Sequence, residues 1–190
     1  MKKIGFIGSG NIASALANAI LEKGVSREII MSDKNPEKLK GVKKSLRVNV
    51  TLHNKEVVNN SEIVFIAVKP QDIGVVLEEI KGVVVEQLIV SVAAGIKLDY
   101  LQSRLKNARI IRVMPNIACL VGEMSAGYSL GKFAKKQDSE ILKQILDSAG
   151  KSVLVDERFL DVITVISGSA PAFISYFLSA IISCGVNYGL

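Results

Sequence analysis

The sequence has no tryptophan, one histidine, two cysteines and four prolines among its 190 residues. Cys119 and Cys184 lie far apart, so we expect neither a disulfide framework nor a cysteine zinc site, and a reducing cytoplasm is the natural setting. His53 alone cannot supply a histidine-rich metal site, and we expect no bound metal. The apolar fraction of 49% against 22% charged residues excludes a disordered chain.

The positive charge is concentrated in the first quarter of the chain. The net charge is +6, and residues 1–50 hold ten Lys or Arg against four Asp or Glu, whereas the rest of the chain is balanced. A basic patch of this kind attracts phosphate, although a solvated helix face has the same composition. Because no aromatic side chain interleaves with these lysines, we do not expect nucleic acid as a partner.

Residues 162–190 carry no charged side chain. An uncharged stretch longer than about 18 residues is a candidate membrane span. Glycines and Pro171 interrupt this stretch, however, and Ser175, Ser179 and Ser183 form a stripe of small residues at helical spacing. We therefore expect a helix starting at Pro171 that is buried against a second copy of the chain. This interpretation predicts a homo-oligomer, a cytoplasmic location and no membrane partner.

Apolar segments and amphipathic helices alternate through residues 1–156. The predicted strands are residues 3–8, 28–32, 48–51, 62–68, 87–92, 109–113, 125–130 and 152–155. The predicted helices are residues 11–23, 36–44, 71–80, 136–148, 157–167 and 171–187, with two short ones beginning at residues 54 and 99. The alternation is typical of a doubly wound, Rossmann-like, mostly parallel α/β sheet. We expect a dinucleotide-binding domain over residues 1–156.

The first predicted strand runs into the pattern G-x-G-x-x-A, which spans residues 8–13. Gly8 would supply a tight turn, Gly10 would let the backbone approach a pyrophosphate, and Ala13 would allow close helix packing. Free N–H groups and the positive end of the helix would face the phosphates. Asp33 follows twenty residues after Ala13, as expected for an acid beside the ribose. We predict a dinucleotide site, with an ordinary glycine-rich βα turn as the alternative.

The choice of dinucleotide depends on the residues after the second predicted strand. Asp33 can bond a ribose 2′-hydroxyl and would repel a 2′-phosphate, which favours NAD(H). Lys34, Asn35 and the basic run behind them favour a 2′-phosphate. We predict NADP(H), with NAD(H) as the alternative.

Three further stretches, residues 67–71, 91–95 and 112–116, follow predicted strands. Ligands bind at the carboxyl ends of strands in open α/β sheets, so these stretches and the glycine turn should share one edge. Small residues there would let a flat nicotinamide ring approach the backbone, and Asn116 could offer its amide to the ring or to the substrate.

These stretches carry a resemblance to the Δ1-pyrroline-5-carboxylate reductase family, which performs the last step of proline synthesis. The matching segments, in the family's order, are residues 5–11 (GFIGSGN), 53–55 (HNK), 67–70 (AVKP), 91–95 (SVAAG), 114–116 (MPN) and 167–172 (SGSAPA). The resemblance implies hydride transfer from NAD(P)H to the cyclic imine of pyrroline-5-carboxylate. It also implies that Ser9, Asn11 and Ile12 hold the pyrophosphate and that Asn35 lies by the 2′-phosphate. The path from adenosine to nicotinamide would be lined by Asn54, Val68, Lys69 and Ala94.

The substrate site is less well defined by the sequence. Residues 167–169 (Ser167, Gly168 and Ser169) would form a turn before the Pro171 helix, and its N–H groups could bind the substrate carboxylate. Together with Asn116 they are our candidates for substrate contact, and no general acid is identified.

The chain also departs from the family pattern. Ile117, Ala118 and Cys119 stand where the family has Thr-Pro-Ala, and Ala170 replaces a glycine. Family members continue through a helical domain, so we expect residues 157–190 to be the start of a truncated dimerisation and substrate domain. The alternatives are a non-catalytic or truncated NADP-binding module and a reductase of the β-hydroxyacid dehydrogenase type. The latter uses a lysine on a later helix, and the helix after Pro171 has none.

Overall fold

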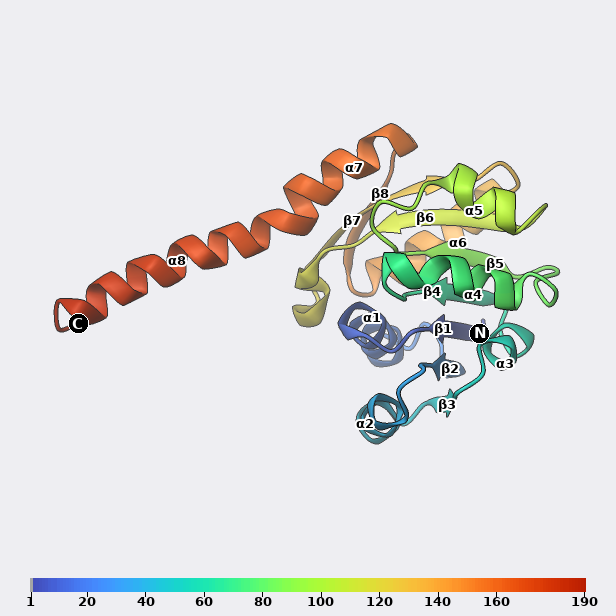
Figure 1. Ribbon diagram of the computed structural model, residues 1–190, viewed down its shortest axis with the longest axis horizontal. Coiled ribbons are helices and arrows are strands. Elements are labelled where there is room, and N and C mark those ends of the chain that lie inside the picture. The colour runs from blue at the N-terminus through green and yellow to red at the C-terminus, as the bar shows by residue number, and fades with distance from the viewer. Residues whose placement is uncertain (1) are drawn as a thin grey trace.

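The computed structural model describes residues 2–190 and contains one eight-stranded sheet (Figure 1). The strands are β1 Ile4–Ile7, β2 Ile29–Ser32, β3 Asn49–Thr51, β4 Ile63–Ile66, β5 Leu88–Ser91, β6 Arg109–Met114, β7 Met124–Leu130 and β8 Gly150–Leu154. Their order is β3-β2-β1-β4-β5-β6-β7-β8, and only the β6–β7 pair is antiparallel. The predicted doubly wound, mostly parallel sheet is therefore confirmed.

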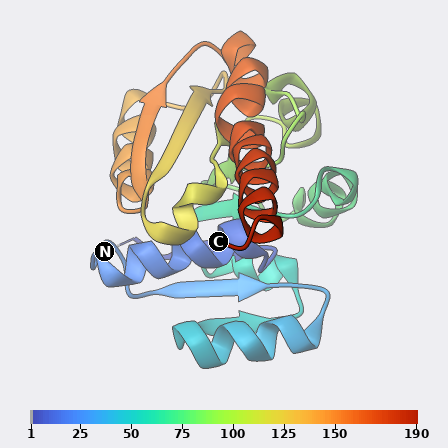
Figure 2. The same cartoon turned by 90° about the vertical axis from the view of Figure 1, so that its left-hand side faces the viewer.

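Helices cover both faces of this sheet. The α-helices are α1 Asn11–Glu22, α2 Pro36–Leu46, α3 Asn54–Asn59, α4 Ile73–Ile80, α5 Leu98–Arg104, α6 Lys136–Asp147, α7 Leu160–Ile163 and α8 Ala170–Asn187. The shorter helical turns are η1 Pro70–Asp72, η2 Ile117–Val121, η3 Glu157–Phe159 and the π-helical η4 Thr164–Ser169. Figure 2 shows α6, in light orange, on one side of the sheet and the green helices α4 and α5 on the other.

The apolar core lies in two layers, one on each side of the sheet. Phe6 of β1 points into the layer beneath α1 and α6, where its ring stacks on that of Phe65 at 4.9 Å, whereas Ile7 points into the layer beneath α3, α4 and α5. Strands buried on both faces need continuous apolar runs, which explains why β4 reads Ile-Val-Phe-Ile without polar residues.

The strand order determines which edge of the sheet is suited to binding a ligand, and we call this edge the functional edge. The chain crosses outward from β1 to β2 and β3 on one side, and from β4 onward on the other. Ile7, the last residue of β1, pairs with Ser32 and Ile66, the last residues of its two neighbours. The carboxyl ends of three strands therefore meet where the strand order reverses, which is where open α/β sheets bind ligands.

The two C-terminal helices predicted for residues 157–167 and 171–187 are one continuous helical run, Glu157–Asn187, of 31 residues. The prediction of a break was wrong because the chain passes Pro171 through the π-helical stretch η4. Proline has no N–H, and its ring clashes with the carbonyl four residues earlier in a regular α-helix. The wider π turn accommodates this ring without ending the helix.

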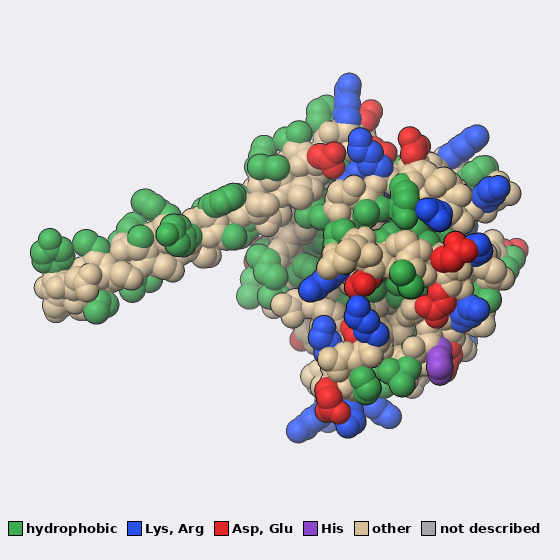
Figure 3. All heavy atoms as spheres, in the orientation of Figure 1, with side chains coloured by type: hydrophobic (Ala, Val, Ile, Leu, Met, Phe, Trp, Pro, Cys, Tyr) green, Lys and Arg blue, Asp and Glu red, His purple; other side chains and the backbone are tan. Residues whose placement is uncertain are grey.

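Helix α8 projects away from the body of the molecule (Figure 1). None of its side chains is buried within residues 2–190, and hydrophobic side chains cover much of the face seen in Figure 3. The run Glu157–Asn187, with a mean hydropathy of 1.7 over its most apolar window, is long and apolar enough to cross a membrane by length and composition. Within residues 2–190 of one copy, then, no element covers this helix.

Candidate functional site

The turn between β1 and α1 is packed tightly against the ends of two neighbouring strands. Gly8 has a positive φ of +100°, and a Cβ atom there would lie 2.6 Å from the backbone oxygen of Ala67 after β4. Its N–H donates to the carbonyl oxygen of Ser32 at 2.8 Å. Only glycine fits this position.

The space around Gly10 is open, in contrast to the crowded space around Gly8. Its backbone is extended (φ −71°, ψ −179°), and a Cβ atom there would have no heavy atom within 4 Å. Gly10 is the N-cap of α1, and no side chain in residues 2–190 caps this helix. The start of α1, with Asn11 and Ile12 in its first turn, thus adjoins open space, as a pyrophosphate requires.

Asp33 stabilises this turn, a role that the sequence did not indicate. Its Oδ2 accepts hydrogen bonds from the N–H of Ser9 at 3.0 Å and from Ser9 Oγ at 2.9 Å, and its Oδ1 accepts one from the N–H of Asn35 at 3.0 Å. Burial opposes ionisation of the carboxyl, but these hydrogen bonds together hold the pKa of Asp33 below its ordinary value. The carboxylate therefore links the glycine turn to the end of β2.

Lys34 and Asn35 lie beside Asp33 at the end of β2. Asn35 caps α2, since its Oδ1 accepts the N–H groups of Glu37 and Lys38. The Lys34 side chain is 83% exposed, and its Nζ lies 3.3 Å from a carboxylate oxygen of Asp72 in η1. Lys and Arg side chains gather around α2, the helix that directly follows these residues, at the bottom of Figure 3.

The other predicted cofactor residues follow β3, β4 and β5. Asn54 begins α3, where its Oδ1 accepts from Ser32 Oγ at 2.7 Å and its Nδ2 donates to Glu79 at 2.7 Å. Val68 and Lys69 connect β4 to η1, and Ala94 follows β5. These positions and the glycine turn all come directly after parallel strands, so the structure brings them to one edge of the sheet, as expected.

The structure also joins two of the substrate candidates. Asn116, after β6, donates from Nδ2 to Ser167 Oγ at 3.2 Å, and its Oδ1 accepts the N–H of Ser125 at 3.1 Å. Gly168 is packed so closely that a Cβ atom there would lie 2.9 Å from Met114 Cε. Residues from β6, β7 and η4 therefore meet at one point.

The expectation that residues 167–169 form a turn with free N–H groups was wrong. Ser167, Gly168 and Ser169 lie inside η4, within the continuous helical run, and Ser169 Oγ donates back to the carbonyl of Thr164 at 3.2 Å. The side chain of Ser167, rather than a helix start, faces the sheet edge. The cause is the π-helical passage around Pro171, which removes the turn.

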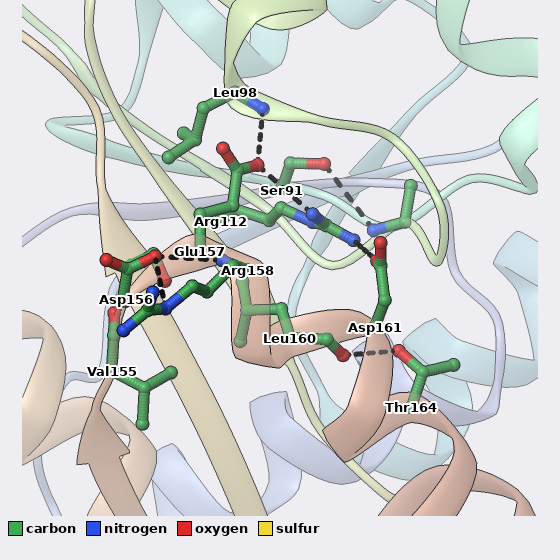
Figure 4. Close-up of polar contacts among 12 residues, drawn as sticks. Ser91, Leu98, Arg112, Val155, Asp156, Glu157, Arg158, Leu160, Asp161 and Thr164 are labelled. Carbon is green, nitrogen blue, oxygen red and sulfur yellow. Dashed lines mark hydrogen bonds and ion pairs between the residues drawn. The ribbon is translucent and has the colours of Figure 1, made fainter.

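Sequence reasoning missed Arg112 of β6, although it singled out the stretch that contains it. Arg112 is buried and pairs with Glu157 and Asp161 at the start of the helical run (Figure 4). The available signal was Arg112 itself, because a cationic residue between the apolar residues Ile111 and Val113 of a buried strand requires partners of opposite charge. Within residues 2–190 as a whole, no group of three or more His, Cys, Asp or Glu side chains is arranged to hold a metal ion.

Two family models match the chain. Residues 3–95 match the model described as NADP oxidoreductase coenzyme F420-dependent, and residues 157–190 match pyrroline-5-carboxylate reductase dimerisation. Among curated relatives, pyrroline-5-carboxylate reductase 2 of Bacillus subtilis is 32% identical over 100% of this chain and 70% of its own length. The reductase of Methanosarcina acetivorans is 37% identical over 100% of this chain and 72% of its own length.

Solved structures give the same result. Plasmodium falciparum pyrroline carboxylate reductase with NADP bound superposes with a TM-score of 0.90 and 31% identity, over 100% of this chain and 71% of that one. The chain thus spans about 70% of the length of these relatives. Prephenate dehydrogenase from A. aeolicus, at 12% identity and a TM-score of 0.76 over 95% of this chain and 69% of its own, shares the fold alone.

Proposed function

The chain belongs to the pyrroline-5-carboxylate reductase family, and on this premise we propose that it reduces Δ1-pyrroline-5-carboxylate to L-proline with NADPH. The observation that carries the proposal is the arrangement at one edge of the sheet. A glycine turn with open space above Gly10 lies on the same edge as the hydrogen-bonded pair of Asn116 and Ser167. The first fits a dinucleotide, and the second provides polar groups for a small substrate.

NADP(H) is the cofactor, and the residues at this edge fit it. Gly8, Ser9 and Gly10 with the first turn of α1 would hold the pyrophosphate, and Asp33 would keep Ser9 in place. Lys34 and Asn35 would lie toward the 2′-phosphate. The remaining path would be lined by Asn54, Val68, Lys69 and Ala94. When bound, reduced NADP supplies the hydride.

The substrate requires orientation more than acid catalysis. A protonated cyclic imine is already electrophilic, so the chain needs mainly to hold its carbon in place and to exclude water. Asn116 and Ser167 are the polar side chains that we place against the substrate carboxylate. Their mutual hydrogen bond and the bond from Ser125 N–H would fix them before the substrate arrives.

We propose that residues 1–156 form the nucleotide domain and that residues 157–190 begin a helical domain through which two copies associate. An isolated, exposed apolar helix supports this, as does the match of the same residues to a dimerisation family. In this assembly, a second copy rather than lipid covers α8, and we place the enzyme in the cytoplasm. Light scattering after size exclusion without detergent tests this, because a clean monomer, or solubility only in detergent, would contradict it.

The experiment for the activity is a turnover assay with pyrroline-5-carboxylate and NADPH, run beside a nucleotide titration. The proposal expects NADPH oxidation that depends on the substrate. Binding of NADPH without turnover would instead identify a non-catalytic nucleotide-binding module. Oxidation of NADPH by a different carbonyl substrate would identify another reductase of this fold.

A further inference from the structure

Arg112 is the largest fully buried side chain of the described residues, and it joins the sheet to the C-terminal helical run. Its side chain is 2% exposed, and its guanidinium donates to Glu157 Oε1 at 3.1 Å and to Asp161 Oδ1 at 2.8 Å. Figure 4 shows the two carboxylates approaching the guanidinium from successive turns of one helical segment. A guanidinium can bond two carboxylates at once because its donors form a planar fork.

Glu157 extends this connection to a third element. Its Oε1 also accepts the N–H of Leu98, the first residue of α5, at 2.7 Å. Within the sheet, Arg112 pairs with Ser91, the last residue of β5, and the proposed cofactor path through Ala94 begins just beyond it. The cluster thus lies directly beside the functional edge.

The helical run contacts the rest of the fold through its first part, up to Gly168, which packs against Met114. Leu160 is fully buried, whereas no side chain of α8 is buried within the described chain. Beyond Asp161, the polar contacts to the rest of the fold are those of Ser167, six residues further along, with Asn116 and Ser125. The orientation of Ser167 therefore depends on how firmly the first two turns are fixed.

We propose that Arg112 is a positioning residue for the reductase reaction: through Glu157 and Asp161 it fixes the helical run so that Ser167 meets Asn116 at the edge where cofactor and substrate come together. This inference rests on the function proposed above. The hydrogen bond and the charge of Arg112 also hold the pKa of Asp161 below its ordinary value.

Variants of Asp161 give the sharpest test, because this side chain is 57% exposed and its removal leaves Arg112 paired with Glu157. Asp161→Ala deletes the acceptor, and Asp161→Asn keeps an oxygen that Arg112 can bond. Arg158→Met is the matched control, since Arg158 lies on the same segment but is exposed, and its polar partner is the neighbouring Asp156 rather than the sheet. The measurements are kcat and KM for pyrroline-5-carboxylate, the Kd of NADPH, and amide hydrogen exchange of the full chain.

For Asp161→Ala we expect kcat/KM to fall about tenfold or more, because small displacements of substrate-contacting groups have large effects on rate. The Kd of NADPH should stay unchanged, and amides of residues 164–169 should exchange faster while those of β1 and α1 do not. Asp161→Asn should recover most of the loss, and Arg158→Met should behave as the unmodified chain.

Two results would overturn the inference. One is unchanged kcat/KM and exchange in Asp161→Ala; the other is a loss of NADPH affinity in proportion to the loss of kcat/KM, which would indicate general disruption. An unmodified chain without turnover would refute the proposed function instead. The exchange measurement would then still decide the matter, because unchanged exchange at residues 164–169 contradicts the positioning role.

Discussion

Replacing Gly10 by valine should abolish nucleotide binding and leave the fold intact. The backbone of Gly10 is extended, a conformation that valine adopts readily, and a Cβ atom there meets no heavy atom within 4 Å. The cost to folding is the loss of a glycine N-cap, about 1 kcal/mol or less. Globular domains have about 5–15 kcal/mol of stability, so the variant should remain folded.

The same open space explains the effect on binding. The valine side chain would occupy the place where a pyrophosphate must approach the backbone. Loss of two charge-assisted hydrogen bonds, each contributing about 1.5–3 kcal/mol, corresponds to a Kd for NADPH that is raised about a hundredfold or more.

Gly8→Ala is the matched control, with the reverse expectation. The positive φ of Gly8 costs a side chain roughly 1–2 kcal/mol, and the added Cβ would lie 2.6 Å from the oxygen of Ala67. This variant should therefore lose thermal stability. The assay combines thermal unfolding with a fluorescence titration of NADPH. A Gly10→Val variant that binds NADPH as tightly as the unmodified chain would refute the assignment of the cofactor to this turn.

Three further predictions concern the choice of cofactor, the association of two copies and the stability in acid. NADPH should bind more tightly than NADH. The difference in affinity should shrink as salt rises, because salt screens the attraction between the exposed Lys34 ammonium and the 2′-phosphate, and it should shrink in Lys34→Ala, which removes that ammonium. Equal affinities at low salt would contradict this. Ser179→Glu should shift the proposed dimer toward monomer in light scattering, because it places a charge on an apolar helix. An unchanged mass would show that this face is not in the proposed interface. Asp33 has a lowered pKa in the fold, so its contribution to stability is present above its unfolded pKa of about 3.9 and is lost as pH falls through the lower, folded value. Asp33→Asn should flatten this acid limb of a denaturation profile, and an unchanged limb would contradict the role of its hydrogen bonds.

The sheet could be predicted from the sequence because its central strands β1, β4 and β5 are almost entirely apolar. Segments such as residues 63–66 are apolar throughout, a pattern typical of parallel strands buried on both faces. The glycine turn was also evident, because both glycines and the helix that follows fall within a few residues of one another. The positions of these residues directly after predicted strands were therefore enough to predict that the cofactor candidates share one edge of the sheet.

Features that depend on contacts between distant residues could not be predicted. The passage of the helix around Pro171 depends on a π-helical stretch, whereas proline in the sequence indicates a break. The pairing of Arg112 with Glu157 and Asp161 spans more than forty residues. Similarly, the hydrogen bonds from Ser9 to Asp33 join two strand ends that only the folded sheet brings together.

The most direct test of the proposed reaction follows the transferred hydride. Purified chain, without detergent, is incubated with pyrroline-5-carboxylate and NADPH that carries deuterium at the transferable position of the nicotinamide C4. Direct hydride transfer predicts L-proline with one deuterium on C5, the carbon of the former imine, in proportion to the NADPH consumed. Tight NADPH binding with no labelled proline formed would contradict it.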